Sequence, residues 1–246
     1  RQISALSPRL LLALDNNETG MFELDRLLNE LSHSTPYKTI VANILHKDKI
    51  NRIVEEYHPE VVFHAAAYKH VGLMEEEPDE AILNNVLGTW NVAQASLLGN
   101  AEKFVFISTD KAVNPTSIMG MTKRIAEQLI LYYNNMHKLG HPSQFIAVRF
   151  GNVLGSRGSV VPLFKEQIRS GGPVTITHPD MKRYFMIPSE AILLVLHAAS
   201  LGRGGEIFVL DMGMPIRIVD MAETMIRLAG FEPYKDIPIA FTTPSS

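Results

Sequence analysis

The sequence contains no cysteine, so the chain can form neither a disulfide nor a thiolate metal site and has no cysteine nucleophile. It also lacks any run of about 18 apolar residues, the length that a membrane-spanning helix requires. A formal net charge of −3 provides no basic field that would attract nucleic acid. Because 46% of the 246 residues are hydrophobic, the chain can bury a substantial core. We therefore expect a globular protein that does not bind nucleic acid.

Histidine is present, but not with the spacing of a metal site. His64 and His70 have no third ligand at a distance along the chain that is typical of zinc sites. We therefore predict no metal site.

Short apolar runs alternate with longer stretches of helical periodicity along most of the chain. This alternation is typical of βα units and predicts an α/β fold with a parallel sheet. The helix expected over residues 117–139 places Ile125, Leu129, Tyr132 and Met136 on one apolar face. The expected strands cover residues 10–14, 37–42, 61–64, 104–107, 145–150 and 206–210, and further helices lie near 50–57, 86–97, 189–201 and 218–229.

The composition changes after residue 151, where glycine, proline and basic residues become frequent. We interpret this change as the start of a smaller, loop-rich lobe. The predicted first domain comprises residues 1–151, with 184–210 returning to it, and the predicted lobe comprises residues 152–183 and 211–246. The chain opens inside what looks like a helix, so we expect it to be a piece of a longer protein.

Asp15 follows the first expected strand. At this position of a dinucleotide-binding fold, a carboxylate accepts the hydroxyls of the adenosine ribose and repels a 2′-phosphate, which favours NAD over NADP. An aspartate after a strand also serves commonly as a helix cap or turn residue. The glycine-rich fingerprint that would precede it is absent from the sequence, and we expect it to lie before Arg1.

The strongest local pattern is Ser108 to Lys111 after a strand, followed by Met119 and Lys123 at the start of a helix. In short-chain dehydrogenases, a serine or threonine ends this strand, and a tyrosine precedes a lysine by four residues on the next helix. That spacing puts both side chains on one helix face. Here the tyrosine position is Met119, and methionine cannot transfer a proton.

Four long segments make the likeness more specific. They are His64–Val71, Asn84–Thr89, Ser108–Pro115 and Arg149–Val160. With these segments in this order, the chain resembles the UDP-N-acetylglucosamine 4,6-dehydratases, a branch of the extended short-chain dehydrogenases, over nearly its whole length up to about Thr242. Methionine in place of tyrosine matches the large, membrane-anchored members of that family.

The resemblance implies a Rossmann-type, doubly wound parallel sheet that is incomplete at its N-terminus, and a small UDP-sugar lobe. It also implies that NAD takes hydride from C4 of the sugar, that water leaves from C6, and that the hydride returns to C6. Thr109, Asp110 and Lys111 match the family's sugar-binding threonine and acid/base pair, while Lys123 matches the lysine that holds the nicotinamide ribose. Without the resemblance, Asp110 and Lys111 would be an exposed turn pair.

Further contacts follow from the same likeness. Small side chains at Ala65, Ala66 and Ala67 would let the dinucleotide approach the backbone, although alanine also serves packing. Asn85 would bind the cofactor or cap its helix. Expected cofactor contacts are Asp15, Asn43, Ile44, Ala65, Ala66, Ala67, Asn85, Ser108, Lys123 and Val153, and expected substrate contacts are Lys69, Asn152, Arg157, Ser159, Val160 and Arg183.

The predicted function is an NAD-dependent lyase that acts on UDP-N-acetylglucosamine for bacterial polysaccharide or glycan synthesis. A UDP-sugar 4-epimerase and a non-catalytic nucleotide-binding module are the alternatives. From the resemblance we expect a cytoplasmic domain of a homo-oligomeric protein that other segments anchor in the inner membrane. The family continues with a diphosphate-binding segment where this chain reads Thr243 to Ser246, so we expect the chain alone to bind NAD poorly.

Overall fold

The computed structural model describes residues 2–30, 35–136, 140, 143–155 and 159–242. The chain divides into two compact units, Arg1–Arg149 with Val195–Val209 and Phe150–Leu194 with Leu210–Ser246. The first boundary lies within two residues of the predicted one. Residues 184–194, which the sequence placed with the first domain, lie in the second unit, because β9 (Phe185–Met186) pairs with β6 (Asn152–Val153).

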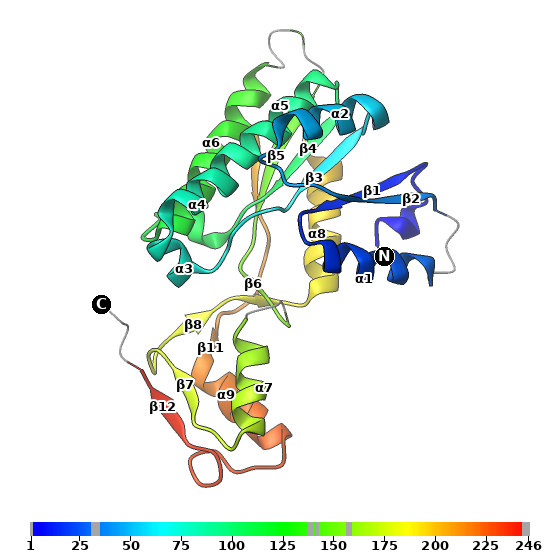
Figure 1. Ribbon diagram of the computed structural model, residues 1–246. Coiled ribbons are helices and arrows are strands. Elements are labelled where there is room, and N and C mark those ends of the chain that lie inside the picture. The colour runs from blue at the N-terminus through cyan, green and yellow to red at the C-terminus, as the bar shows by residue number, and fades with distance from the viewer. Residues whose placement is uncertain (1, 31–34, 137–139, 141–142, 156–158, 243–246) are drawn as a thin grey trace. The chain divides into compact units, whose positions relative to one another are not determined.

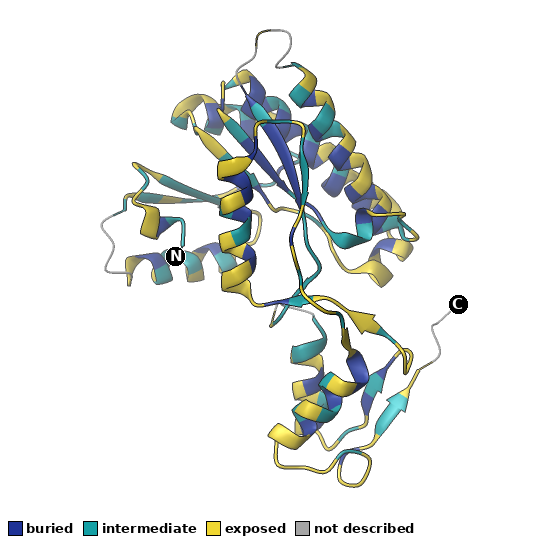
Figure 2. Cartoon of the chain, turned by 180° about the vertical axis from the view of Figure 1, so that it is seen from behind, coloured by how far each residue is buried: buried dark blue, intermediate teal, exposed yellow. Residues whose placement is uncertain are grey.

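A four-stranded parallel sheet forms the centre of the first unit. Its order is β10-β5-β4-β3, and every neighbouring pair is parallel. The central strands β4 and β5 are the most buried part of this sheet, which Figure 2 shows in dark blue. Continuous apolar runs suit strands that are covered on both faces. The bounds are β3 Val61–His64, β4 Lys103–Ile107, β5 Gln144–Arg149 and β10 Ile207–Val209.

A second parallel pair of strands precedes this sheet in the sequence. Among the described residues, β1 (Leu11–Asp15) pairs with β2 (Tyr37–Val41), and neither strand is hydrogen-bonded to the four-stranded sheet. The short 3-10 helix Ser4–Leu6 precedes β1. Helix α1 (Glu18–Asn29) connects the two strands and begins at Asn17, whose side chain accepts a hydrogen bond from the Gly20 amide.

Helices cover both faces of the four-stranded sheet. Helices α5 and α6 lie along one face, and residues Val195–Leu201 of α8 (Pro188–Leu201) lie on the other (Figures 1 and 2). A π-helix at Leu83–Leu87 leads directly into α5. The remaining bounds are α2 Lys47–Tyr57, α3 Val71–Glu76, α4 Pro78–Ile82, α5 Gly88–Leu98, the 3-10 turn Asp110–Ala112 and α6 Ile118–Met136.

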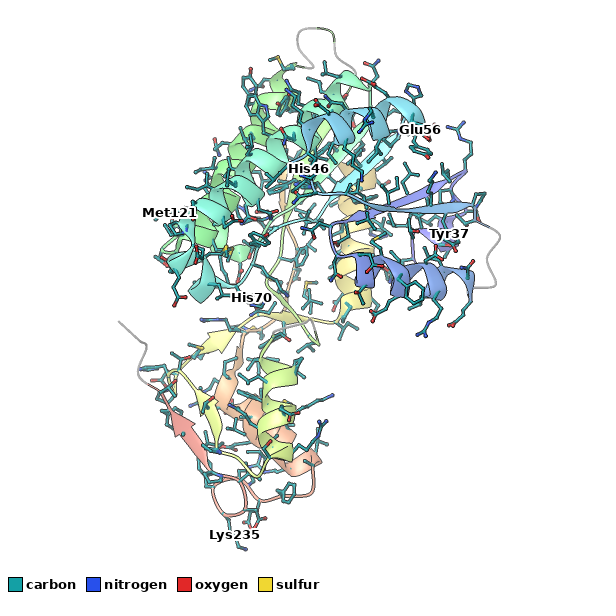
Figure 3. The ribbon with its side chains drawn as sticks, viewed as in Figure 1. Tyr37, His46, Glu56, His70, Met121 and Lys235 are labelled. Atoms are coloured by element: carbon teal, nitrogen blue, oxygen red, sulfur yellow. The ribbon has the colours of Figure 1, made fainter. Side chains whose placement is uncertain are left out.

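Helix α6 does not bury the apolar face that its sequence suggested. Ile125 and Tyr132 are 48% and 49% exposed, whereas Lys123 and Glu127 face the protein interior at 6% and 0%. Met121, which is also exposed, lies on the outer side of this helix (Figure 3). The face that packs against the sheet therefore carries the two ionisable groups together with the core residues Ala126, Ile130 and Tyr133.

The second unit has its own hydrophobic core. Helices α7 (Val160–Arg169) and α9 (Ile218–Leu228) pack around the parallel pair β7 (Val174–Ile176) and β12 (Ile239–Phe241). Strands β8 (Lys182–Arg183) and β11 (Ile216–Arg217) form an antiparallel pair beside it. Within the described part of the chain, none of the helices has both the length and the apolarity that crossing a membrane requires.

Candidate active site at the ends of β3, β4 and β5

Polar residues follow β4 without interruption from Ser108 to Lys111. Thr109 caps the 3-10 turn, since its Oγ1 accepts a hydrogen bond from the Lys111 amide at 3.3 Å. The same hydroxyl donates to Asp110 Oδ1 at 2.9 Å, and Lys111 Nζ lies 3.0 Å from that carboxylate oxygen. The side chains of Lys111 and Asp110 are 32% and 28% exposed, so a ligand can reach the pair.

The first turn of α6 packs directly against this 3-10 turn. Ser117 Oγ accepts a hydrogen bond from the Gly120 amide at 3.1 Å, and Glu75 Oε1 accepts one from the Ile118 amide at 2.7 Å. These bonds satisfy amides that the first turn of a helix leaves free. A Cβ on Gly120 would come within 2.5 Å of the Lys111 carbonyl oxygen. Glycine is needed there because the turn lies directly against the helix.

Lys123 is buried where α6 meets the sheet. Its Nζ donates to the Ile107 carbonyl at 2.6 Å and lies 4.1 Å from the centre of the Phe106 ring. Burial lowers the pKa of Lys123 to about 7, although the negative charge of Glu127 acts in the opposite direction. The amine at the end of β4 therefore changes charge near neutral pH.

Met119 occupies the position where a short-chain dehydrogenase carries tyrosine. It is 4% exposed and packs with Met74 of α3 and Ala81 of α4. The thioether fills apolar space between three helices and offers no proton to transfer. Met119 therefore cannot take part in proton transfer.

Sequence reasoning missed Glu127, which is fully buried four residues after Lys123. Arg149 donates to both of its carboxylate oxygens, at 2.7 and 2.6 Å, and Ser108 Oγ donates to Oε1 at 2.6 Å. Arg124 Nη1 adds a bond of 3.0 Å to Oε2. Burial acts to raise the pKa of Glu127, but hydrogen bonds from Arg149, Ser108 and Arg124 outweigh it and hold the pKa below its ordinary value. The available signal was the lysine–glutamate spacing on one helix face.

His64 joins the end of β3 to α5. Its Nε2 lies 2.9 Å from Thr89 Oγ1, and the Thr89 hydroxyl donates its single hydrogen to the Asn85 carbonyl at 2.7 Å. Nε2 must therefore carry the imidazole hydrogen. Burial and the charge of Lys123 lower the pKa of His64 to about 3, which keeps the ring neutral.

Asn85 holds the loop that follows β3. Its Oδ1 accepts from the Tyr68 amide at 2.7 Å, while Nδ2 donates to the Tyr68 carbonyl at 2.9 Å and to Thr122 Oγ1 at 3.0 Å. The π-helix positions this side chain, and π-helical turns are frequent at functional sites. Asn85 is 1% exposed and its side-chain amide is hydrogen-bonded to other protein groups, so any effect of Asn85 on a cofactor acts through the position of the loop.

The loop itself presents small side chains. Ala65 and Ala66 are exposed and Ala67 is partly buried, while Lys69 is exposed at the far end of the loop. His70, the N-cap residue of α3, lies at the end of this segment (Figure 3). The structure thus brings the alanine loop, Ser108 to Lys111 and Lys123 to the carboxyl ends of adjacent strands, where parallel sheets bind ligands.

The remaining predicted cofactor residues of the first unit shape turns. Asp15 Oδ1 accepts from the Asn17 amide at 2.9 Å, and Asn43 Oδ1 accepts from the Leu45 amide at 2.8 Å. Ile44 is buried against α2 and α5. An open hollow after Ile44 is lined by Leu45, His46, Lys47, Asp48, Lys49 and Arg52 (Figure 3 labels His46).

The predicted sugar-binding residues other than Lys69 belong to the second unit, as does Val153. Asn152 and Val153 form β6, and Val160 opens α7 with Ser159 as its N-cap. Arg183 is exposed on β8 and donates to the Lys182 carbonyl at 2.9 Å. Arg157 lies outside the described residues. In the described part of the chain, histidine, aspartate and glutamate form no cluster of three that could hold a metal ion.

Comparison with known proteins identifies the family, which the geometry of the site does not show. The profile of the family described as polysaccharide biosynthesis protein matches residues 1–244. The chain belongs to this family.

Three curated relatives show what the chain is similar to. The capsular polysaccharide biosynthesis protein CapD of Staphylococcus aureus is 50% identical over 243 residues, which are 98% of this chain and 40% of that protein. An uncharacterized membrane protein of Methanocaldococcus jannaschii is 48% identical over 95% of this chain and 68% of its own length. A UDP-glucose 4-epimerase of Rickettsia canadensis is 45% identical over 148 residues, 60% of this chain and 43% of that protein. The chain thus spans about 40% of the length of the Staphylococcus aureus relative.

Solved structures confirm the predicted Rossmann-type α/β fold. Pen from Bacillus thuringiensis has a TM-score of 0.90 and 33% identity, and the match covers 100% of this chain and 75% of that one. DesIV, a dTDP-glucose 4,6-dehydratase from Streptomyces venezuelae with NAD bound, has a TM-score of 0.83 and 15% identity, covering 98% of this chain and 79% of that one. At that identity the second likeness concerns the fold alone. The predicted family is thereby confirmed at the level of polysaccharide biosynthesis proteins.

Proposed function

We propose that the protein is an NAD-dependent nucleotide-sugar 4,6-dehydratase that acts on UDP-N-acetylglucosamine. The observation that carries this proposal is the accessible Asp110–Lys111 pair directly after β4, together with Met119 buried in an apolar cluster. A dehydratase needs an acid and a base close together, whereas it can dispense with the phenol that Met119 replaces.

The described residues fit NAD. The exposed alanine side chains after β3 leave room for close approach to a backbone that Asn85 holds in place, and Asp15 ends β1 with its carboxylate exposed. Lys123 provides an amine at the end of β4 that is charged below about neutral pH. When bound, NAD would supply the hydride acceptor for C4 and the hydride donor for C6 of the sugar.

The residues after β4 would move the protons. Asp110 and Lys111, whose Oδ1 and Nζ lie 3.0 Å apart, offer one proton acceptor and one donor in the same place. The pair would take the C5 proton of the 4-keto sugar and deliver a proton to the 6-hydroxyl that leaves as water. Thr109 would orient the sugar at C4, and Asp110 would also receive the proton of the C4 hydroxyl. No net oxidation results, because the hydride and a proton return to C6 and C5.

A 4-epimerase is the second candidate, favoured by the 45% identity to the Rickettsia canadensis protein of that name. An epimerase would need a proton-transferring group where Met119 lies and would have no use for the acid/base pair. The two functions therefore predict different products from the same substrate.

Proton NMR of the full-length protein with NAD and UDP-N-acetylglucosamine separates the alternatives. A C6 methyl signal, which the Asp110→Asn variant should not produce, supports the dehydratase. A product with the galacto configuration, in place of the C6 methyl signal, would support the epimerase instead. An unchanged spectrum, with NAD binding detected by calorimetry, would leave a non-catalytic module.

Assembly and location are part of the same proposal. The Methanocaldococcus jannaschii relative is named a membrane protein, which supports a membrane anchor. We propose that this anchor lies in the inner membrane, outside residues 1–246, and that the catalytic domain is cytoplasmic. We also propose a homo-oligomer, which light scattering of the full-length protein would test.

A further inference from the structure

The carboxylate of Glu127 takes part in none of the proposed chemical steps. It is fully buried in the middle of α6, yet hydrogen bonds reach it from three elements of the first unit: Ser108 after β4, Arg149 of β5 and Arg124 of α6. A carboxylate is costly to bury even when paired, and an apolar side chain of similar volume would hold helix and sheet together at least as well. The arrangement therefore needs an explanation other than packing.

Ser108 shows the first consequence of this arrangement. A serine hydroxyl has one hydrogen, and Ser108 donates it to Glu127 Oε1 at 2.6 Å. Toward any ligand at the end of β4, Ser108 can then act only as an acceptor. Glu127 thus selects for a ligand hydroxyl or amide hydrogen at this position and against a carbonyl or phosphate oxygen.

Lys123 shows the second consequence. It lies one helical turn before Glu127 on the same buried face of α6, and the charge of Glu127 favours its ammonium form. Two arginines share the Glu127 carboxylate and weaken that influence. His64 on β3 also interacts with Lys123, and it is neutral because burial lowers its pKa to about 3.

We propose that Glu127 is a positioning residue of the candidate site, which fixes Ser108 as a hydrogen-bond acceptor and, balanced by Arg124 and Arg149, sets the charge state of Lys123. Its relevance to turnover rests on the proposed function, but its effect on Lys123 does not. A purely structural ion pair would hold α6 against β5 without linking the pH dependence of turnover to the charge of Glu127.

The test follows the titration of Lys123 directly, by carbon-13 NMR of its labelled Cε in the 246-residue chain, with a Lys123→Met sample to assign the signal. Glu127→Gln removes the negative charge and keeps the size, so the midpoint should fall by on the order of one pH unit. Arg124→Gln removes a cation from the same carboxylate, so the midpoint should rise. Arg124 is 44% exposed, so this variant can be made even where Glu127→Gln does not fold.

Arg169→Gln is the matched control. Arg169 pairs with Glu166 on α7 with the same i, i+3 spacing and the same 3.0 Å distance, but in the second unit. It should leave the Lys123 midpoint unchanged. Opposite shifts for Glu127→Gln and Arg124→Gln support the proposal; shifts in the same direction, or a midpoint that Arg124→Gln does not raise, would overturn it.

Activity gives a separate reading in the full-length protein. The alkaline limb of the kcat/KM profile should move to lower pH in Glu127→Gln by the amount that NMR records. If NMR shows the opposite shifts but UDP-N-acetylglucosamine is not converted, the proposed function fails while the role of Glu127 stands. If the sugar is converted but the two Lys123 midpoints do not move in opposite directions, the proposed role of Glu127 fails while the proposed function stands.

Discussion

Replacing Gly120 with alanine tests whether the turn that carries the acid/base pair is positioned by direct contact with α6. The added Cβ would lie 2.5 Å from the Lys111 carbonyl oxygen, about 0.9 Å closer than ordinary contact at 3.4 Å, and 3.2 Å from Pro115 Cβ. The obstacle is backbone, so the turn must move as a whole. Overpacking of this kind costs about 1–3 kcal/mol, which opposes the gain of up to about 1 kcal/mol that alanine gives in a helix.

Gly72→Ala is the matched control, because Gly72 is also helical and its added Cβ would meet no atom within 4 Å. We expect denaturant unfolding to place Gly120→Ala about 1–3 kcal/mol below Gly72→Ala in stability. A displacement of Asp110 near 1 Å should lower kcat about 100-fold in the full-length enzyme, while KM changes less. Equal stability and activity in the two variants would refute the close contact and, with it, the positioning of the pair.

Three further outcomes are expected. Asp110→Asn should lower kcat by about 10² to 10⁴ in the NMR assay without lowering the unfolding midpoint, because its ion pair is partly exposed; unchanged turnover would remove Asp110 from the mechanism. Asn85→Ala should destabilise the chain by about 2–4 kcal/mol in urea, since the Tyr68 amide and carbonyl lose their partner; a loss below about 1 kcal/mol would mean that the loop is held otherwise. In the unfolded state His64 is protonated below pH 6.5, whereas in the folded state it stays neutral down to about pH 3. The free energy of unfolding should therefore fall as the pH falls from 6.5 to about 3, by on the order of 4 kcal/mol. His64→Gln should flatten that fall, and an identical acid profile would contradict the buried neutral ring.

The local pattern of the chain was sufficient to locate the strands. The run 61–64 coincides with β3 to the residue. The predictions for β2 and β4 differ from the observed strands by one residue at one end, and those for β1, β5 and β10 by one residue at each end. Strand positions follow from continuous apolar runs, which only a covered sheet can accommodate. The sequence placed residues 184–194 with the first domain, whereas in the structure they lie in the second unit, where β9 pairs with β6.

The orientation of α6 was not available from its sequence. Two apolar stripes run along this helix, one with Ile125 and Tyr132 and one with Ile130 and Tyr133, and periodicity alone does not decide which of them is buried. Lys123 and Glu127 become tolerable in the interior only because Ile107, Ser108 and Arg149 supply hydrogen bonds from other elements. Such partners lie 16 to 22 residues away, where sequence periodicity carries no information.

The sequence by itself determined the α/β class, the strand ends where polar residues gather, and the Ser108–Lys111 segment with its helical lysine. These are local properties, because apolar runs and turn residues act over a few positions. Only the tertiary structure decided that Met119 packs into an apolar cluster, that Asn85 holds the loop at Tyr68, and that Glu127 takes the hydrogen of Ser108. Each of those outcomes is a contact between residues that are far apart in the sequence. Such contacts form only when the helices pack on the sheet.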